Sequence, residues 1–269
     1  MKGSHAILYI ITVLLLSWIV QIVLFLGILP GKWLIFYMYV PALTAFFFFF
    51  IDRKPFSDQI KLFARRISLW SLVFAFGYPI FWLGIVVLMG YVTGLGQINF
   101  SFLPALMSFS FWGVFGLTLL TGLPSMFGEE YGWRGYLLPA LAEKRNLLAS
   151  TLILGAVWGL WHLPSYYIIY SKIGIGNPFL LTILGMITVA VGAFPYTYCF
   201  YLTRNIIPCV ILHGVYDLAA GHLFFGTPAM NGLSPEVPGI LTIYWPYAQV
   251  LLIITGLMFA FLFARKFSA

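Results

Sequence analysis

Residues 128–135 read Gly-Glu-Glu-Tyr-Gly-Trp-Arg-Gly, and they put Glu129, Glu130 and Arg134 into a run from Phe100 to Ala142 with no other charged side chain. A charge in hydrocarbon costs at least about 2.5 kcal/mol on insertion scales. Three charges this close together therefore need partners. In a helix Glu130 and Arg134 share a face and can pair, whereas Glu129 is rotated by about 100° and is free to face another group. A charge cluster that only fixes helix packing is the alternative, although ionisable groups at membrane depth usually mark a functional site.

The composition identifies a membrane protein. Of the 269 residues, 62% are hydrophobic and 8% are charged, whereas soluble domains are about 25% charged. The net charge of +7 comes from Lys and Arg that lie between apolar runs, so it does not indicate nucleic-acid binding. Cys199 and Cys209 lie in apolar segments and lack the spacing of a metal site or a disulfide framework.

Hydropathy predicts an all-α fold of about eight transmembrane helices, each close to the ~20 residues that cross a bilayer. The predicted spans are residues 6–29, 33–51, 68–92, 103–142, 147–170, 179–203, 206–226 and 240–264. The fourth span is too long for a simple crossing, and Pro124 predicts either a kink or two half-helices there. The first apolar run, residues 6–29, is too long for the hydrophobic region of a signal peptide. No linker or internal repeat divides the chain, so residues 1–269 are expected to form a single transmembrane domain.

The basic residues predict the orientation in the membrane. Alternate loops and ends contain Arg53, Lys54, Lys61, Arg65, Arg66, Lys144, Arg145, Arg204, Arg265 and Lys266, and the other loops contain only Lys32 and Lys172. Because cytoplasmic loops are enriched in Lys and Arg, eight spans place both termini in the cytoplasm.

The connection from Asp52 to Arg66 also has an amphipathic pattern. Phe56, Ile60, Leu62 and Phe63 alternate with its charges. Either a short interfacial helix or an ordinary cytoplasmic loop fits this pattern.

Polar groups on three predicted helices lie at similar depth. At about 1.5 Å per residue, Glu129 and His162 lie roughly 20 Å from the cytoplasmic ends of their helices, and His213 and Asp217 roughly 10–18 Å. Pro164 predicts a helix bend beside His162. A lone buried histidine is usually a packing residue, but agreement in depth favours a shared site.

The remaining histidines are expected to lie outside this site. His222 is further toward the outer end and about 90° from the His213 face, so we interpret it as structural or interfacial. His5 precedes the first helix and is expected to be an exposed terminal residue. No second aspartate lies at depth to pair with Asp217, which excludes an aspartyl protease dyad, and the His-Glu-x-x-His and Gly-x-Ser-x-Gly signatures are absent.

A carboxylate and imidazoles in a water-accessible cavity can activate water for attack on a carbonyl. Three motifs follow one another on separate predicted helices: Glu-Glu-x-x-x-Arg (Glu129, Glu130, Arg134), aromatic-x-x-x-His (Trp158, His162) and His-x-x-x-Asp (His213, Asp217). This ordered set resembles the CPBP family of intramembrane proteases, which contains the CAAX prenyl endopeptidases together with bacteriocin-processing and immunity-associated members. The resemblance covers about residues 103–225. Trp158 stands where the family often has Phe, which we interpret as a harmless exchange, and Asp217 stands where prenyl proteases usually have Asn.

The resemblance implies an intramembrane endopeptidase that hydrolyses a peptide bond of a membrane-associated or prenylated, CAAX-like substrate, either a peptide or a lipidated protein. It implies Glu129 as the general base, His162 as a group that positions the water, and His213 with Asp217 as stabilisers of the oxyanion. Glu130 and Arg134 would form a structural ion pair. Asp217 is expected to be a neutral donor because Asn is the commoner residue there. Since Asp at this position is common in bacterial members, we expect a multi-pass protein of a bacterial plasma membrane.

Three alternatives stay open at the level of sequence. His162, His213 and Glu130 could hold zinc, although a glutamate-driven mechanism without metal uses the same residues and is favoured. A catalytically silent family member, acting in bacteriocin immunity or binding, would keep the fold. A proton-coupled transporter would also use buried Glu, His and Asp, but the chain lacks the paired broken helices of many transporter halves.

Overall fold

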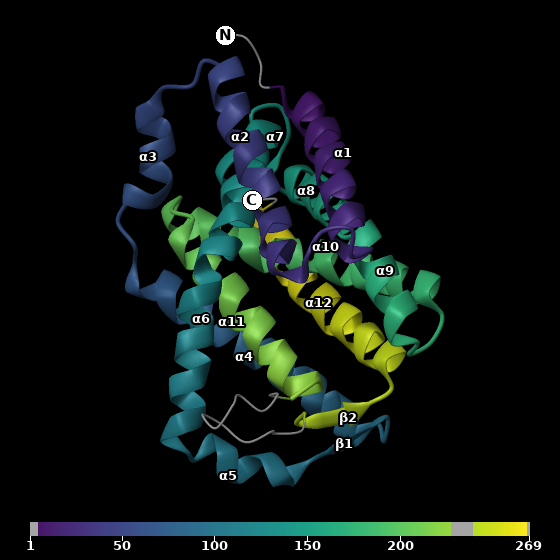
Figure 1. The fold of residues 1–269 in the computed structure, drawn as a ribbon. Coiled ribbons are helices and arrows are strands. Elements are labelled where there is room, and N and C mark those ends of the chain that lie inside the picture. The colour runs from purple at the N-terminus through teal and green to yellow at the C-terminus, as the bar shows by residue number, and fades with distance from the viewer. Residues whose placement is uncertain (1–4, 227–238, 268–269) are drawn as a thin grey trace.

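The computed structural model describes residues 5–226 and 239–267. Nearly all of them are helical (Figure 1). In chain order the elements are α1 (Ala6–Phe25), the 3-10 helix η1 (Gly31–Tyr39), α2 (Val40–Ile51), α3 (Phe56–Ala64), α4 (Leu69–Val92), β1 (Gly96–Ile98), the 3-10 helix η2 (Phe100–Phe102), α5 (Leu103–Leu106), α6 (Phe109–Glu130), the π-helix η3 (Tyr131–Leu137), α7 (Leu138–Ala142), α8 (Leu147–Trp161), α9 (Leu163–Ile173), α10 (Pro178–Thr203), α11 (Ile207–Phe224), β2 (Leu241–Ile243) and α12 (Trp245–Phe267).

The predicted all-α polytopic fold is confirmed, with a different count of spans. Within the described residues, six helices are long and apolar enough to cross a membrane, or seven if the bent pair α8–α9 forms one span. The predicted span 33–51 is not among these helices, because its first part winds as the 3-10 helix η1. Its continuous apolar helix, Phe36–Ile51, is shorter than the helices that can cross a membrane. η1 packs closely on α6, where the carbonyl of Met38 would lie 2.7 Å from a Cβ at Gly128.

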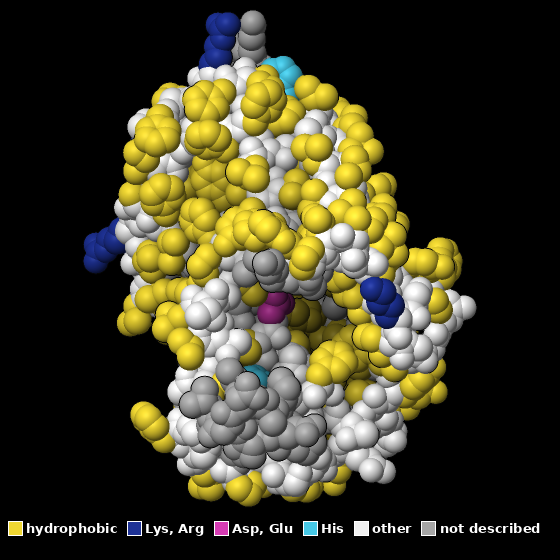
Figure 2. Space-filling view, viewed as in Figure 1, with side chains coloured by type: hydrophobic (Ala, Val, Ile, Leu, Met, Phe, Trp, Pro, Cys, Tyr) yellow, Lys and Arg dark blue, Asp and Glu magenta, His cyan; other side chains and the backbone are white. Residues whose placement is uncertain are grey.

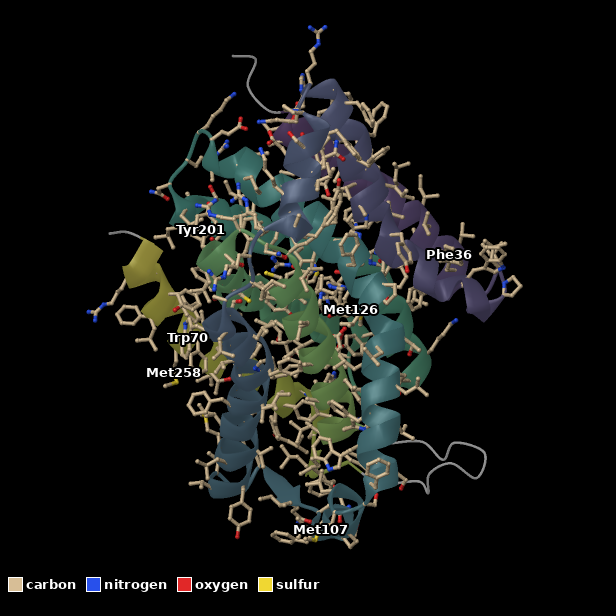
Figure 3. The ribbon with its side chains drawn as sticks, turned by 90° about the vertical axis from the view of Figure 1, so that its left-hand side faces the viewer. Phe36, Trp70, Met107, Met126, Tyr201 and Met258 are labelled. Carbon is tan, nitrogen blue, oxygen red and sulfur yellow. The ribbon has the colours of Figure 1, made fainter. Side chains whose placement is uncertain are left out.

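The long helices run between two ends of the molecule (Figure 1). One end, here called the basic end, contains residues 52–68, 143–146 and 204–206, which hold most of the Lys and Arg. The opposite end, here called the strand end, contains α5 and the antiparallel pair β1–β2, in which Gly96 faces Ile243. Phe36, Trp70 and Met258 are exposed and point away from the bundle (Figure 3), as expected for side chains that face lipid.

Close backbone contact holds α8 against α10. A Cβ at Gly155 or Gly159 would lie 2.6 Å from the carbonyl oxygen of Ala190 or Met186, respectively. Small residues four apart allow such approach between membrane helices. This packing places the end of α8, with Trp158 and His162, beside the middle of α10.

The long fourth segment is one helical body. α6 continues through Pro124. Residues 109–142 form one continuous helical segment that is long and apolar enough to cross a membrane. The alternative of two half-helices is therefore wrong. The departure from α-helical winding lies instead at η3, directly after Glu129 and Glu130. π-helical turns occur frequently at functional sites.

The predicted bend beside His162 is confirmed. α8 ends at Trp161, α9 begins at Leu163 with Pro164 in its first turn, and the two helices meet at 44°. Pro164 has no N–H to donate to the preceding turn, so α8 cannot continue unchanged.

The segment from Asp52 to Arg66 contains a helix, α3, and not only a loop. Phe56, Ile60 and Phe63 are exposed on it. Its other side is held to the bundle, because Gln59 Oε1 accepts from Tyr131 Oη at 2.9 Å and the Leu62 carbonyl accepts from Ile206 N at 2.7 Å. α3 therefore packs against η3 and against the start of α11.

Candidate active site

The four catalytic candidates Glu129, His162, His213 and Asp217 line one cavity of about 410 Å³, here called the central cavity. α6 contributes Glu129, the α8–α9 bend contributes His162, and α11 contributes His213 and Asp217. The surface is hollowed in the half of the molecule away from the N-terminus, and an acidic side chain is visible inside the hollow (Figure 2). Three helices far apart in the sequence thus bring the predicted groups together.

Two indole N–H groups fix the carboxylate of Glu129. Its Oε2 accepts from Trp158 Nε1 at 3.0 Å and from Trp133 Nε1 at 3.4 Å. The residue is only 1% exposed, and neither indole bond uses Oε1. A carboxylate held through one oxygen keeps the other available for a water molecule in the cavity.

Trp158 contacts most of the polar groups around the site. Besides its bond to Glu129, its ring lies 4.2 Å from the Arg134 guanidinium carbon and 5.6 Å from the His213 ring. The exchange of Phe for Trp158, interpreted from the sequence as harmless, adds a hydrogen-bond donor to Glu129, because Phe has no N–H. The sequence could have indicated this hydrogen bond, since among Phe, Tyr and Trp only Trp has a ring N–H donor.

Glu130 and Arg134 form a fully buried ion pair behind the cavity wall, with Oε1 and Nη1 2.9 Å apart. Arg134 also lies 4.4 Å from the ring of Tyr196, so aromatic faces of Trp158 and Tyr196 contact its guanidinium. Cation–π contact stabilises a desolvated cation. Among the described residues, no hydrogen-bond partner is present for Glu130 Oε2 or for Arg134 Nε and Nη2. The ring contacts therefore supply stabilisation of the buried guanidinium that hydrogen bonds to Nε and Nη2 do not.

His213 bridges the buried pair and the cavity. Its Nδ1 lies 2.9 Å from Glu130 Oε1, and its Nε2 lies 3.5 Å from Asp217 Oδ2. A carboxylate paired with arginine is an acceptor, so Nδ1 carries the proton in this contact. The i, i+4 spacing predicted the contact with Asp217, but nothing in the sequence pointed to the one with Glu130.

Asp217 is the most accessible of these groups, since its side chain is 44% exposed. It lies on the cavity wall beside His213, with Tyr216 and Ala220 of the same helix. Its carboxyl can therefore reach a bound substrate, whereas Glu130 cannot.

His162 is held by ring contacts. Its imidazole stacks on Tyr166 with ring centroids 4.7 Å apart and an angle of 6° between the planes. It also makes a T-shaped contact with Trp161, with ring centroids 4.6 Å apart. This stacking fixes the plane of the ring at the cavity wall. Tyr166 was not identified from the sequence, although the i, i+4 spacing from His162 could have indicated it.

The other two histidines lie apart from the central cavity. His222 stacks on Phe115 at 5.6 Å. His5 is exposed as predicted, but it also pairs with Asp52 through Nδ1 and Oδ1 at 2.6 Å, near the basic end.

The candidate zinc set His162, His213 and Glu130 does not fit a metal ion in this arrangement. Glu130 Oε1 is shared by Arg134 and by His213 Nδ1, and a guanidinium beside that oxygen opposes a divalent cation. Within the described residues, no group of three His, Cys, Asp or Glu side chains is placed to hold a metal. No catalytic step is therefore assigned to a metal.

Comparison with known proteins agrees with the three motifs. Residues 107–219 match the family described as Type II CAAX prenyl endopeptidase Rce1-like. This part of the chain is therefore similar to that family. The matched range contains the whole central set from Glu129 to Asp217, so the resemblance inferred from the motifs is confirmed.

One relative of the Rce1-like region is named for its activity. CAAX prenyl protease 2 of Methanococcus maripaludis is 32% identical over 98 residues, which are 34% of this chain and 34% of the relative. The match thus spans about one third of the length of that protein.

Proposed function

We propose that this chain is an intramembrane endopeptidase of a bacterial plasma membrane, which hydrolyses a peptide bond of a membrane-associated substrate with water activated by Glu129. The observation that carries this proposal is the convergence of Glu129, His162, His213 and Asp217 on one cavity within an apolar helical bundle. The Rce1-like match over the same residues supports it.

The chemistry follows from the position of each group. A water bound beside Glu129 Oε1 and the His162 ring gives a proton to the carboxylate, and its oxygen attacks the carbonyl carbon of the scissile bond. Charge develops on the carbonyl oxygen, where donors from the His213–Asp217 pair stabilise it. Glu129 then transfers the proton to the leaving nitrogen as the C–N bond breaks.

The buried charges give this arrangement its rigidity. Glu130 and Arg134 are shielded from the cavity, and Glu130 orients His213 through Nδ1. Trp158 connects the same cluster to Glu129. A base and an oxyanion donor held by one buried network need little reorganisation when the transition state forms.

The substrate is a peptide or a lipidated protein. Aromatic and aliphatic side chains line most of the cavity, among them Tyr166, Ile169 and Phe224, which favours apolar residues near the scissile bond. The name of the archaeal relative, CAAX prenyl protease 2, makes a prenylated peptide one substrate to test. An Asp at position 217, where prenyl proteases usually have Asn, makes an unprenylated peptide equally important.

Product mass spectrometry tests this function. Purified wild type, Glu129→Gln and Glu143→Gln are incubated in detergent with prenylated and unprenylated peptides. Glu143 is a matched control because it pairs with Lys54 at the surface of the basic end. We expect wild type and Glu143→Gln to cleave, and Glu129→Gln to lose about 10²–10⁴-fold in rate.

Two outcomes would overturn the proposal. Undiminished cleavage by folded Glu129→Gln would exclude the assigned base. A folded wild type that binds these peptides and leaves them intact would favour a catalytically silent binding protein.

A further inference from the structure

A pocket of about 220 Å³, here called the α3 pocket, lies between α3 and the bundle at the basic end. α3 forms one wall, and residues of η3, α7 and the end of α10 form the others. None of its lining residues takes part in the proposed reaction. Its charged side chains are four basic ones, Lys54, Lys61, Arg65 and Arg204, and three acidic ones, Asp52, Asp58 and Glu143.

The three carboxylates of the α3 pocket already have partners within the protein. The contacts are Lys54 Nζ with Glu143 Oε1 (2.6 Å), Lys61 Nζ with Asp58 Oδ1 (2.7 Å), His5 Nδ1 with Asp52 Oδ1 (2.6 Å) and Tyr136 Oη with Asp52 Oδ2 (2.7 Å). These contacts satisfy the acidic groups, so the carboxylates are not the counter-ions of the remaining two basic residues.

Arg65 and Arg204 are those two residues. Among the residues that the structure describes, neither guanidinium forms an ion pair with a carboxylate. The guanidinium carbon of Arg204 lies 3.4 Å from the ring centre of Tyr201, and this contact orients the side chain at the pocket. The α3 pocket thus presents two cations to an anion from outside the protein.

The backbone around these two arginines is held in place by Asn205, which is fully buried. Its Nδ2 donates to the carbonyl oxygens of Arg65 at 2.6 Å and of Phe63 at 3.1 Å. Arg204 itself has a φ of 54°, a left-handed conformation that few residues other than glycine adopt. Such conformations persist where the surrounding structure imposes them, so the end of α3 and the end of α10 are fixed beside one another.

α3 has two different faces. Phe56, Ile60 and Phe63 are exposed on one face, whereas Lys61 and the following Arg65 line the α3 pocket on the other. A helix with this pattern lies at the boundary between acyl chains and headgroups. Its charged face is then at the depth of the lipid phosphates, whose oxygens accept hydrogen bonds from arginine in a bidentate geometry.

We propose that the α3 pocket binds the phosphate of an anionic membrane phospholipid. Arg65 and Arg204 donate to the phosphate oxygens, and Lys54 and Lys61 add positive charge beside them. The bound headgroup connects α3 to the end of α10. The α3 pocket and the central cavity share no lining residue, so the proposal does not depend on the proposed function.

Native mass spectrometry tests the proposal without requiring activity. Detergent-solubilised protein freed of lipid is titrated with phosphatidylglycerol or with phosphatidylcholine of the same acyl chains, and the fraction with bound lipid gives the affinity. The variant Arg65→Gln/Arg204→Gln removes the two cations. The matched control is Arg145→Gln/Arg265→Gln, which removes the same charge outside the α3 pocket. Arg265 also lies over an aromatic ring, 4.8 Å from the centre of Phe261.

We expect wild type and the control variant to bind phosphatidylglycerol in preference to phosphatidylcholine. Arg65→Gln/Arg204→Gln should bind phosphatidylglycerol roughly 30-fold more weakly, since each basic residue near an anionic lipid contributes about fivefold. Arg65→Lys/Arg204→Lys keeps the charge and should recover most of this affinity. Equal binding of the two lipids by wild type, or equal losses in the variant and its control, would overturn the proposal.

Two further measurements use wild type, so they do not depend on the folding of any variant. Phosphatidylglycerol with a photoreactive group in its headgroup is crosslinked to the protein, and we expect the modified peptides to contain residues 52–66 or 200–206. Crosslinks confined to other segments would exclude the α3 pocket. Inorganic phosphate is titrated separately, and a protein that binds it but not phosphatidylglycerol would have a site for free phosphate and not for a lipid.

Discussion

Replacing Trp158 by Phe removes one hydrogen-bond donor from the site while keeping an aromatic ring. The indole N–H of Trp158 donates to Glu129 Oε2 at 3.0 Å, and the remaining donor, Trp133, is 3.4 Å away. A hydrogen bond to a charged group contributes about 1.5–3 kcal/mol. Since each 1.36 kcal/mol is tenfold in rate, we expect kcat to fall by about 10- to 150-fold if the whole bond orients the base.

The matched control is Trp161→Phe on the same helix, which keeps an aromatic ring beside His162. Trp161 is also fully buried, but its Nε1 has no hydrogen-bond partner among the described residues. Both substitutions remove the same volume, so both should lower the thermal midpoint through imperfect packing. Only Trp158→Phe removes a donor to Glu129, and only this variant should show the large fall in kcat.

The assay is steady-state cleavage of a peptide in detergent, with kcat and KM determined separately and the thermal midpoint measured for each variant. Loss of base positioning lowers kcat with little change in KM. If kcat falls equally in Trp158→Phe and Trp161→Phe, the lost ring volume and not the lost donor to Glu129 explains the fall in kcat. An unchanged kcat in folded Trp158→Phe would refute the assignment of Trp158 as a positioning residue.

Three further results are expected. Glu130→Ala and Arg134→Ala should each destabilise the protein by about 3–5 kcal/mol, because each leaves a buried charge without its partner; normal thermal midpoints in both variants would contradict the structural ion pair. Asp217→Asn should retain activity and keep it to higher pH, because the amide donates a hydrogen bond and cannot ionise. A tenfold or greater loss with folding unchanged would instead assign Asp217 the orientation of a charged His213. Activity should survive exhaustive chelation, and loss that added zinc restores would overturn metal-independent water activation.

The sequence alone predicted features that depend on local spacing. A spacing of four positions from Glu130 to Arg134, and from His213 to Asp217, puts each pair on one helical face, and both contacts occur. The bend beside His162 followed from Pro164, because proline lacks the N–H that the preceding turn requires. Hydropathy identified the apolar helices, because a span must be apolar over its whole length.

Local rules also misplaced some features. Pro124 was expected to mark the irregularity in the long fourth segment, but the winding changes at η3, after the glutamates. The predicted span 33–51 became a 3-10 helix followed by a short α-helix, in contact with Gly128 of α6. Such departures depend on packing between helices, which hydropathy along one segment does not describe.

Only the tertiary structure decided which groups share a partner. Glu130 accepts from both Arg134 and His213, and Trp158 joins Glu129 to that buried cluster. These contacts link α6, α8 and α11, so no periodicity within one helix encodes them.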